Sequence, residues 1–331
     1  MTTYKEIFGK YVKNYSSDPT ADAEGQIWYN TTSGTFKTNV NLFGVWAAGA
    51  NMATARNPDG VGIQTATVVF GGNSPTLSPT HSNLTEEYDG STWSPGGNMN
   101  VGRRQMVAFG TQTAAVGAAG YTNTPSPSFP MATEEYDGST WTIGNNVNSP
   151  PTDILAGAGT GTLTAGLAFG GYVITATRSY DGTNWTAVNS MNTGRGYLAG
   201  AGTQTASLAF GGNSGGPETM TNTESWNGTS WTSVNSLNTG RRNVGGAGIQ
   251  TAALAFGGVA APGVTAATES WNGTSWTTTP ATMATARGSL AGTGSQTLAL
   301  GAGGYTSAPG SSNATEEYTD PSFSTKTITT S

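Results

Sequence analysis

Between residues 46 and 323 the chain alternates short apolar runs with polar turns, in a pattern that returns every 44–48 residues. One unit contains a Gly/Ala-rich run (197–202), an apolar run ending in paired glycines (207–212), a TESW stretch (223–226) and a closing tryptophan, Trp231. Helical periodicity is absent from this region. Each unit is therefore predicted to form four short β-strands, and the protein to be all-β.

The closing tryptophans mark the repeats most clearly. They are Trp93, Trp141, Trp185, Trp231 and Trp276, and Trp46 stands 47 residues before the first of them. Units of this length with four strands fit one blade of a β-propeller, and the Asp-Gly or Asn-Gly pair before each of these five tryptophans is a hairpin signal. Six blades are predicted over residues 46–331. The small residues of the first strand are expected to line a crowded central channel.

Two segments can supply the fourth strand of the last blade, and the sequence leaves both open. Phe323 stands where a closing tryptophan is expected, so residues 321–331 can complete the blade as a local hairpin. Trp46 is the better match, because GANMATAR (49–56) repeats the text that follows other closing tryptophans, such as NSLNTGRR (235–242). In that arrangement the N-terminal side of the propeller clasps its C-terminal side.

Charged residues recur at fixed places in the repeat. An arginine follows most closing tryptophans by ten or eleven residues, and a glutamate precedes the aromatic residue of most third strands by two. Both signs are reversed in the third unit, which predicts an ion pair within each blade. The predicted pairs are Arg56–Glu86, Arg103–Glu134, Asp153–Arg178, Arg195–Glu224, Arg241–Glu269 and Arg287–Glu316. The alternative is a ring of arginines that binds an anionic ligand.

Composition narrows the chemistry. The 331 residues include 49 Gly, one His and no Cys, with a net charge of −6 at pH 7. Disulfides and thiolate sites are excluded, and a single imidazole is too few for a histidine metal site. The acidic balance argues against nucleic acid, and no apolar run is long enough to span a bilayer. We therefore expect no cofactor, no metal, no nucleic-acid partner and no membrane insertion.

Catalytic constellations are lacking in the sequence. His81 lies in a loop rich in Pro and Ser (73–83) and is expected to be an exposed loop residue. Adjacent glutamates on one strand point to opposite faces, which makes them a poor acid–base pair for glycoside hydrolysis. Such neighbours are Glu86–Glu87, Glu134–Glu135 and Glu316–Glu317. The chain is predicted not to be an enzyme.

The loops between the second and third strands differ most from blade to blade. They are rich in Pro, Ser, Asn and Thr, and one of them, 172–176, is short. Binding sites on a rigid scaffold usually lie in such loops, and neutral polar residues with scattered tyrosines suit a carbohydrate or protein partner. The candidate ligand-binding residues are Tyr121, Phe129, Tyr172 and Tyr305. Exposed loops that vary without a function are the alternative.

Residues 1–45 do not follow the blade pattern. Residues 4–19 fit a helix face or an irregular strand equally well, whereas residues 23–40 are predicted to form a β-hairpin. So short an apolar extension cannot bury itself and is expected to dock on a partner or a neighbouring copy. The candidate attachment residues are Tyr4, Phe8, Tyr11, Trp28, Tyr29 and Phe36.

The paired glycines followed by an aromatic residue and a closing tryptophan resemble kelch repeats over about residues 46–323. In one respect the chain departs from that family, because Tyr88 and Trp93 are joined by a tighter turn. The resemblance implies a six-bladed kelch-like β-propeller with four-stranded blades. It says little about activity.

A second resemblance bears on function. Residues 16–37 (SSDPTADAEGQIWYNTTSGTFK) are similar to an N-terminal module of tail and other virion proteins of marine bacteriophages, especially those of cyanobacteria. In that group the module precedes TESWNGTSW-type repeats like 223–231, and the ending TKTITTS (325–331) is also similar. The resemblance implies a non-enzymatic virion protein that is anchored to other virion proteins by its N-terminal segment. Its propeller is expected to contact a host-surface glycan or protein, and the chain to form a homo-oligomer.

Two other functions remain open at this stage. YDGSTW (88–93) partly matches the Asp-box turn of sialidase-type propellers, although it is one residue short. A sialidase-like or other carbohydrate-active enzyme is therefore the alternative. The third hypothesis is a purely architectural protein without a ligand.

Overall fold

The computed structural model of the chain describes residues 13–17, 27–40, 44–74, 80–122, 131–147, 155–307, 310–320 and 324–327. It divides into two compact units. Unit 1 comprises Met1–Gly44 and Asp320–Ser331, and unit 2 comprises Val45–Thr319. The two units are described separately.

Unit 2 is a β-propeller whose described residues form six four-stranded antiparallel blades. Blades 1 to 3 consist of β5 (Asn57–Ile63), β6 (Ala66–Asn73), β7 (Thr85–Tyr88) and β8 (Trp93–Pro95); β10 (Val107–Thr111), β11 (Ala114–Ala118), β13 (Thr133–Tyr136) and β14 (Trp141–Gly144); and β15 (Ala158–Thr162), β16 (Ala165–Phe169), β17 (Thr177–Tyr180) and β18 (Trp185–Val188). Blades 4 to 6 consist of β19 (Ala199–Gly202), β20 (Ser207–Phe210), β21 (Thr223–Trp226) and β22 (Trp231–Val234); β23 (Gly245–Ile249), β24 (Ala252–Phe256), β27 (Ala267–Trp271) and β28 (Trp276–Thr282); and β29 (Ala291–Gly294), β30 (Leu298–Ala302), β31 (Thr315–Thr319) and β4 (Val45–Ala48).

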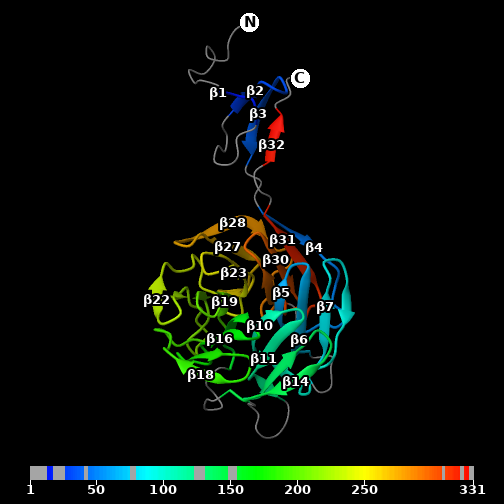
Figure 1. The fold of residues 1–331 in the computed structure, drawn as a ribbon, viewed down its shortest axis with the longest axis vertical. Helices are drawn as coiled ribbons and strands as arrows, with labels where there is room; N and C mark the ends of the chain where they lie inside the picture. Colours follow the sequence, from blue (N-terminus) through cyan, green and yellow to red (C-terminus); the bar gives the residue numbers. More distant parts are fainter. Residues whose placement is uncertain are drawn as a thin grey trace. The chain divides into compact units, whose positions relative to one another are not determined.

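The blades follow one another around the ring in chain order (Figure 1). Each innermost strand packs against the next, and β29 of blade 6 packs against β5 of blade 1, so the ring is closed. Two short ribbons also belong to this unit. They are β9 (Arg103–Arg104) with β12 (Tyr121–Thr122), and β25 (Val259–Ala260) with β26 (Gly263–Val264). The predicted all-β propeller is therefore confirmed.

The ring closes through Trp46. Strand β4 pairs antiparallel with β31, and Trp46 stands opposite Tyr318. This confirms the clasp by the N-terminal side, whereas Phe323 lies outside the described residues. The predicted C-terminal boundary of the propeller at residue 331 is wrong, because β32 (Ser324–Thr327) pairs with β3 (Thr35–Val40) in the sheet of unit 1.

Glycine permits the crowding at the ring axis. Gly202 ends the first strand of blade 4 with a φ of +128°, and a Cβ there would lie 2.1 Å from the carbonyl oxygen of Ala206. A Cβ on Gly292 would lie 2.5 Å from the backbone nitrogen of Gly246 in the neighbouring blade. A side chain at Gly292 would force neighbouring first strands apart, and one at Gly202 would disrupt the turn into the second strand of its own blade. The Gly-rich runs therefore follow from the close packing at the channel and from the tight turns beside it.

The closing tryptophans join neighbouring blades. Each indole N–H donates to the hydroxyl of a threonine near the start of the third strand of the preceding blade, at 2.9–3.0 Å. The six bonds are Trp46–Thr268, Trp93–Thr315, Trp141–Thr85, Trp185–Thr133, Trp231–Thr177 and Trp276–Thr223. Tryptophan therefore recurs because it fills the space between blades and satisfies a polar atom of the preceding one.

Five of the six predicted ion pairs are present and buried. Nitrogen–oxygen distances are 2.5–2.9 Å for four of them, and Arg56–Glu86 is also in contact. Burial lowers the pKa of each of these arginines, and the paired glutamate opposes that shift. Asp153 lies outside the described residues, so its pairing with the half-buried Arg178 stays a prediction.

Each buried arginine also donates hydrogen bonds to backbone carbonyl groups of its blade. Arg287, for example, donates to the carbonyl oxygens of Gly303 and Ala314 at 2.7 and 2.6 Å, while Glu316 accepts from the N–H of Ala284 at 2.5 Å. The pair thus links the segment entering the blade to its second and third strands. The described pairs are structural, as predicted, and do not form an anion-binding ring.

Unit 1 contains a small sheet in the order β1-β2-β3-β32, where β1 is Lys13–Tyr15 and β2 is Ile27–Asn30. Strands β2 and β3 form the predicted hairpin, with the rings of Tyr29 and Phe36 5.2 Å apart. The side chain of Trp28 is only 2% exposed, so its assignment to an attachment surface is wrong. Tyr4, Phe8 and Tyr11 lie outside the described residues.

The buried pairs generate a stability prediction. Glu269→Gln leaves the charge of Arg241 buried without its counter-ion, so we expect a loss of about 3–5 kcal/mol in the free energy of unfolding. Urea unfolding followed by tryptophan fluorescence measures this, because eight of the nine tryptophans belong to the propeller. Glu218→Gln, at an exposed loop position, is the matched control and should change stability by less than about 0.5 kcal/mol. Equal effects of the two substitutions would contradict the prediction.

Candidate functional site

The channel has two mouths of different character. At one, the hairpins between first and second strands bring together Gly, Ala, Val, Thr and Phe, and none of the described residues that line the hollow is charged. At the other, the first strand begins opposite the end of the second, as Asn57 stands opposite Asn73 in blade 1. The described ends of the variable loops between second and third strands therefore lie at this second opening, which we call the loop mouth.

Two repeat positions supply the side chains of the loop mouth. The first is the residue directly after the paired glycines, or after Ala-Gly in blade 2, at the end of the second strand. In blades 1 to 6 these residues are Asn73, Tyr121, Tyr172, Asn213, Val259 and Tyr305. The second position directly follows the buried arginine and pairs across with the first, as in Arg104 opposite Tyr121 and Arg242 opposite Val259. The buried ion pairs thus place these side chains at the rim.

The residue two positions after each buried arginine turns toward the axis. Gln105, Tyr197, Asn243 and Ser289 all have φ between +50° and +56°. The backbone N–H of Asn243 donates to the carbonyl of Tyr197 at 2.8 Å, and that of Ser289 donates to the carbonyl of Asn243 at 2.9 Å. Proline, Pro58, occupies this position in blade 1 and has no N–H to continue the series.

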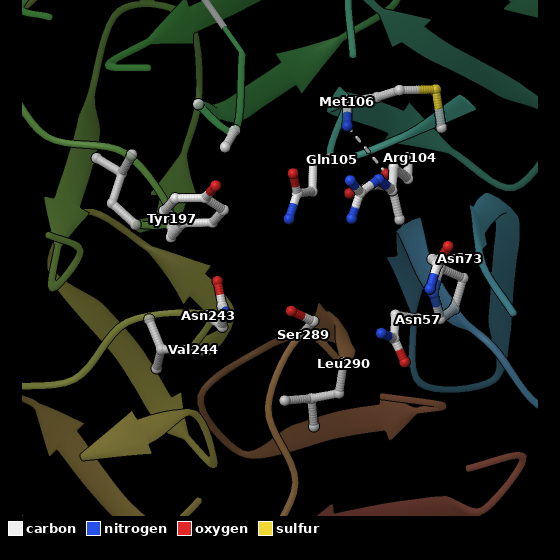
Figure 2. A pocket seen from close by; sticks show the side chains of 15 residues that line it. Asn57, Asn73, Arg104, Gln105, Met106, Tyr197, Asn243, Val244, Ser289 and Leu290 are labelled. Atoms are coloured by element: carbon white, nitrogen blue, oxygen red, sulfur yellow. Dashed lines mark hydrogen bonds between the residues drawn. The ribbon is translucent and has the colours of Figure 1, made fainter. Parts of the chain in front are cut away.

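These residues surround a central hollow of about 120 Å³, lined by Asn57, Asp59, Asn73, Arg104, Gln105, Tyr197, Asn243 and Ser289 among others. Figure 2 shows the side chains of Asn57, Arg104, Gln105, Asn243 and Ser289 around this opening. A side hollow of about 320 Å³ shares Gln105, Tyr197 and Asn243 with it. Tyr172, Asn213, Gly215, Gly216 and Arg242 complete the lining of the side hollow.

Three of the four predicted ligand-binding aromatics meet at this mouth. The guanidinium of Arg104 lies over the ring of Tyr121 at 5.4 Å, and Tyr172, which lines the side hollow, is 48% exposed. Burial and the hydroxyl of Tyr197 raise the pKa of Tyr121. Asn243 donates to the hydroxyl of Tyr305 at 3.2 Å. Phe129 lies outside the described residues.

His81 corrects an expectation. It was predicted to be an exposed loop residue, but it is only 9% exposed, because its backbone pairs with Asn73 and folds the loop back onto the blade. Burial lowers the pKa of His81, and the positive charge of Arg104 adds to that effect. The Pro/Ser-rich composition of the loop did not indicate this return.

Asp59 is a titratable group of the mouth that sequence reasoning missed. Its position is apolar in other blades, where Met106, Leu198, Val244 and Leu290 stand. Burial raises the pKa of Asp59 to about 7, although the N–H of Met106, 3.1 Å from Oδ2, and the charge of Arg103 act in the opposite direction. An aspartate in an otherwise apolar column was the available signal.

Several buried polar atoms at the mouth have no hydrogen-bond partner. They are Oδ1 of Asn57, Nε of Arg104 and Oδ1 of Asn213. Buried polar atoms are normally paired, and leaving one unpaired costs about 1–3 kcal/mol. Unpaired nitrogens also occur on buried structural arginines such as Arg56 and Arg195. The amide oxygens of Asn57 and Asn213 differ from these because both side chains line a hollow, where a donor of a ligand can reach them.

The neighbouring glutamates lie elsewhere in the fold. Glu87, Glu135 and Glu317 accept hydrogen bonds from Tyr136, Tyr180 and Tyr88 of adjacent blades. The first glutamate of each couple holds a buried arginine. In the part of the chain that the structure describes, no three acidic, histidine or cysteine residues are grouped to hold a metal ion. Among the described residues, no helix is long and apolar enough to cross a membrane.

Neither the comparison with protein-family models nor the search of curated proteins finds a match for this chain. The function of the site is therefore argued from its geometry.

Asp59 generates a prediction of pH dependence. Because the folded state raises its pKa from 3.8 to about 7, Asp59 takes up a proton on folding, and stability should fall as pH rises from about 4 to 7. Asp59→Asn removes this pH dependence, so we expect the variant to be more stable than the parent above pH 7, by about 4 kcal/mol, and equally stable near pH 4. Thermal unfolding across pH 4–8 measures the difference, and Glu218→Gln is the control. A difference that does not change with pH would refute the assignment.

Proposed function

We propose that this chain is a bacteriophage virion protein whose propeller binds a carbohydrate of the host surface at the loop mouth. The observation that carries the proposal is the gathering of Tyr172 and Tyr197 with arginine and amide side chains around two hollows that share part of their lining. Tyr121 lies beside them, under the guanidinium of Arg104. Unit 1 attaches the protein to other virion proteins in this proposal, and the assembled form is a homo-oligomer.

The residue types favour a carbohydrate over an apolar ligand. A tyrosine offers an apolar face to the C–H face of a sugar and a hydroxyl to its hydroxyl groups. Amide side chains such as Gln105 and Asn243 can both donate and accept, as a polyhydroxylated ligand requires. The unpaired oxygens of Asn57 and Asn213 are acceptors for sugar hydroxyls.

The position of the chain ends in the propeller suits display of this mouth. Val45 and Thr319, the first and last residues of unit 2, pair with each other. Thr319 also stands opposite Leu298, in the hairpin at the other mouth. Both ends therefore lie at the face opposite the loop mouth, and a tether at that face leaves the loops free of the connection.

The virion role is supported by the similarity of residues 16–37 and of the TESWNGTSW repeats to marine phage proteins. Within unit 1, Tyr29 is half-buried and Phe36 exposed on the described hairpin, and they are the candidate attachment residues of that hairpin that remain accessible.

A carbohydrate-active enzyme is the second candidate, because Arg104, Tyr121 and Asp59 meet near one mouth and sugar-cleaving sites combine such groups. Release of reducing sugar from host envelope polysaccharide distinguishes the two functions. Turnover that is lost in Asp59→Asn would favour the enzyme over the binding protein.

The loop mouth generates a binding prediction. Tyr172→Ala should weaken binding of the labelled full chain to marine cyanobacterial cells by about tenfold or more, as expected for a central interface tyrosine. Its melting temperature should be unchanged because the side chain is half exposed. Flow cytometry on a panel of strains measures binding, before and after periodate oxidation of the surface glycans.

Ile143→Ala, an exposed apolar residue on β14, is the matched control and should bind as the parent does. Binding that survives periodate but not protease treatment would replace the glycan by a protein receptor. Equal binding by Tyr172→Ala and the parent would overturn the assignment of the loop mouth.

A further inference from the structure

The side hollow contains a buried acceptor without a donor. Asn213 is 4% exposed, and its amide nitrogen donates to the carbonyl of Gly216 at 2.7 Å. Its Oδ1 has no partner although the side chain lines the hollow. A ligand that enters here must supply an O–H or N–H donor to remove the cost of the unpaired oxygen.

A guanidinium lies beside this acceptor. Nη1 of Arg242 donates to the same Gly216 carbonyl, at 3.3 Å, so one backbone oxygen holds the two side chains next to each other. This hydrogen bond is long and goes to an exposed carbonyl. Among the described residues, no carboxylate forms an ion pair with Arg242, so most of its N–H donors remain available for a ligand. Arginine presents five donors, and a carboxylate accepts two of them in parallel.

The loop that carries Gly216 is held against blade 3. Gly215 has a φ of +97°, and a Cβ on it would lie 2.7 Å from Cγ2 of Val173. The short loop of blade 3 therefore packs closely on the loop of blade 4 and sets the exposed ring of Tyr172 at the edge of the hollow. Tyr197 and Asn243 extend the lining toward the central hollow, as Figure 2 shows for these two residues.

The charge of the side hollow is opposite to that of the chain. The protein has a net charge of −6, yet among the described residues that line this hollow Arg242 is the charged one, and none of them is a carboxylate. The nearest acid in the loop sequence, Glu218, is exposed outside the lining. Asp59 belongs to the central hollow. An anionic group is therefore favoured in the side hollow over a cation.

From this arrangement we infer that the side hollow binds a carboxylate-bearing sugar unit, such as a uronic acid. The carboxylate pairs with Arg242, a ring hydroxyl donates to Oδ1 of Asn213, and the sugar lies against Tyr172. The inference rests on the proposed function and names the chemical class of its ligand. A neutral sugar could donate a hydroxyl to Oδ1 of Asn213, but it has no carboxylate to form two parallel hydrogen bonds with the guanidinium of Arg242.

The test pairs each acidic glycan with its neutral form. A glycan array carries oligosaccharides of glucuronic, galacturonic and sialic acid, each beside its carboxyl-reduced counterpart, and the labelled full chain is applied. We expect binding to carboxylated forms that is about tenfold or more stronger than binding to the reduced forms, the range of one charge-assisted hydrogen-bonded pair.

The variants separate charge, fork geometry and the acceptor. Arg242→Gln should abolish the preference for the carboxylated form, Arg242→Lys should restore it in part, and Asn213→Ala should weaken binding without changing the preference. Lys37→Gln, in unit 1, removes the same charge and should bind as the parent does. Melting temperatures of all variants, measured in parallel, exclude loss of fold as the cause.

The outcomes distinguish the inference from the proposed function. Equal binding of carboxylated and reduced glycans, or a preference that survives Arg242→Gln, would overturn the acidic ligand while leaving carbohydrate binding intact. Binding to cyanobacterial cells with no binding to any carboxylated glycan would also overturn it. Failure to bind cells and glycans alike would overturn the proposed function itself.

Discussion

The buried arginine–glutamate pair is the constraint on which the propeller and its binding face both depend. In each of five blades the arginine joins the segment entering the blade to the third strand, with both partners removed from water. A buried charge is tolerated only when it is paired and hydrogen-bonded, so the position of the arginine backbone is closely determined. The positions of the two residues that follow the arginine are therefore also fixed. The first pairs with the residue at the end of the second strand, and the second turns toward the ring axis. Arg104 and Gln105 after Arg103, and Arg242 and Asn243 after Arg241, are consequences of the same interaction that holds the blade.

Periodic features could be read from the sequence because each blade repeats the same physical problem. The closing tryptophans, the Gly-rich first strands and the ion pairs recur since every blade must pack on its neighbour in the same way, and the structure confirms them where it describes them. That Trp46 supplies the strand that closes the ring could be predicted for the same reason, because its neighbouring residues follow the repeat. Features without a counterpart in other repeats could not be predicted from the sequence. The pairing of His81 with Asn73 and the burial of Trp28 in unit 1 depend on contacts that occur once.

The residues of the loop mouth could be predicted only in part, because some of them come together only when the ring closes. Tyr121, Tyr172 and Tyr305 are predicted because they stand in variable loops, whereas their partners Arg104, Tyr197 and Asn243 lie in the repeat itself. Tyr197 and Asn243 also belong to other blades than Tyr121, Tyr172 and Tyr305. Closing the ring brings together residues that are distant in the sequence. The informative signal is the departure of one position from its column, as with Asp59 among apolar residues and Pro58 among residues of positive φ. In a pseudo-symmetric ring, a specific site arises where the symmetry is broken.

Such a site is well suited to weak recognition that is repeated many times. The described backbone at the axis end of the mouth is held by the ion pairs and by hydrogen bonds between successive blades, so little freedom of this backbone remains to be lost on binding. The side hollow accommodates only a small part of a polysaccharide, which limits the affinity of one copy. If the protein acts in the proposed virion role, with several copies displayed on one particle, the second and later contacts become intramolecular and the overall strength rises without any new contact within a single site. A rigid propeller with a modest pocket is therefore sufficient for the proposed role, because the assembly supplies what the individual mouth lacks.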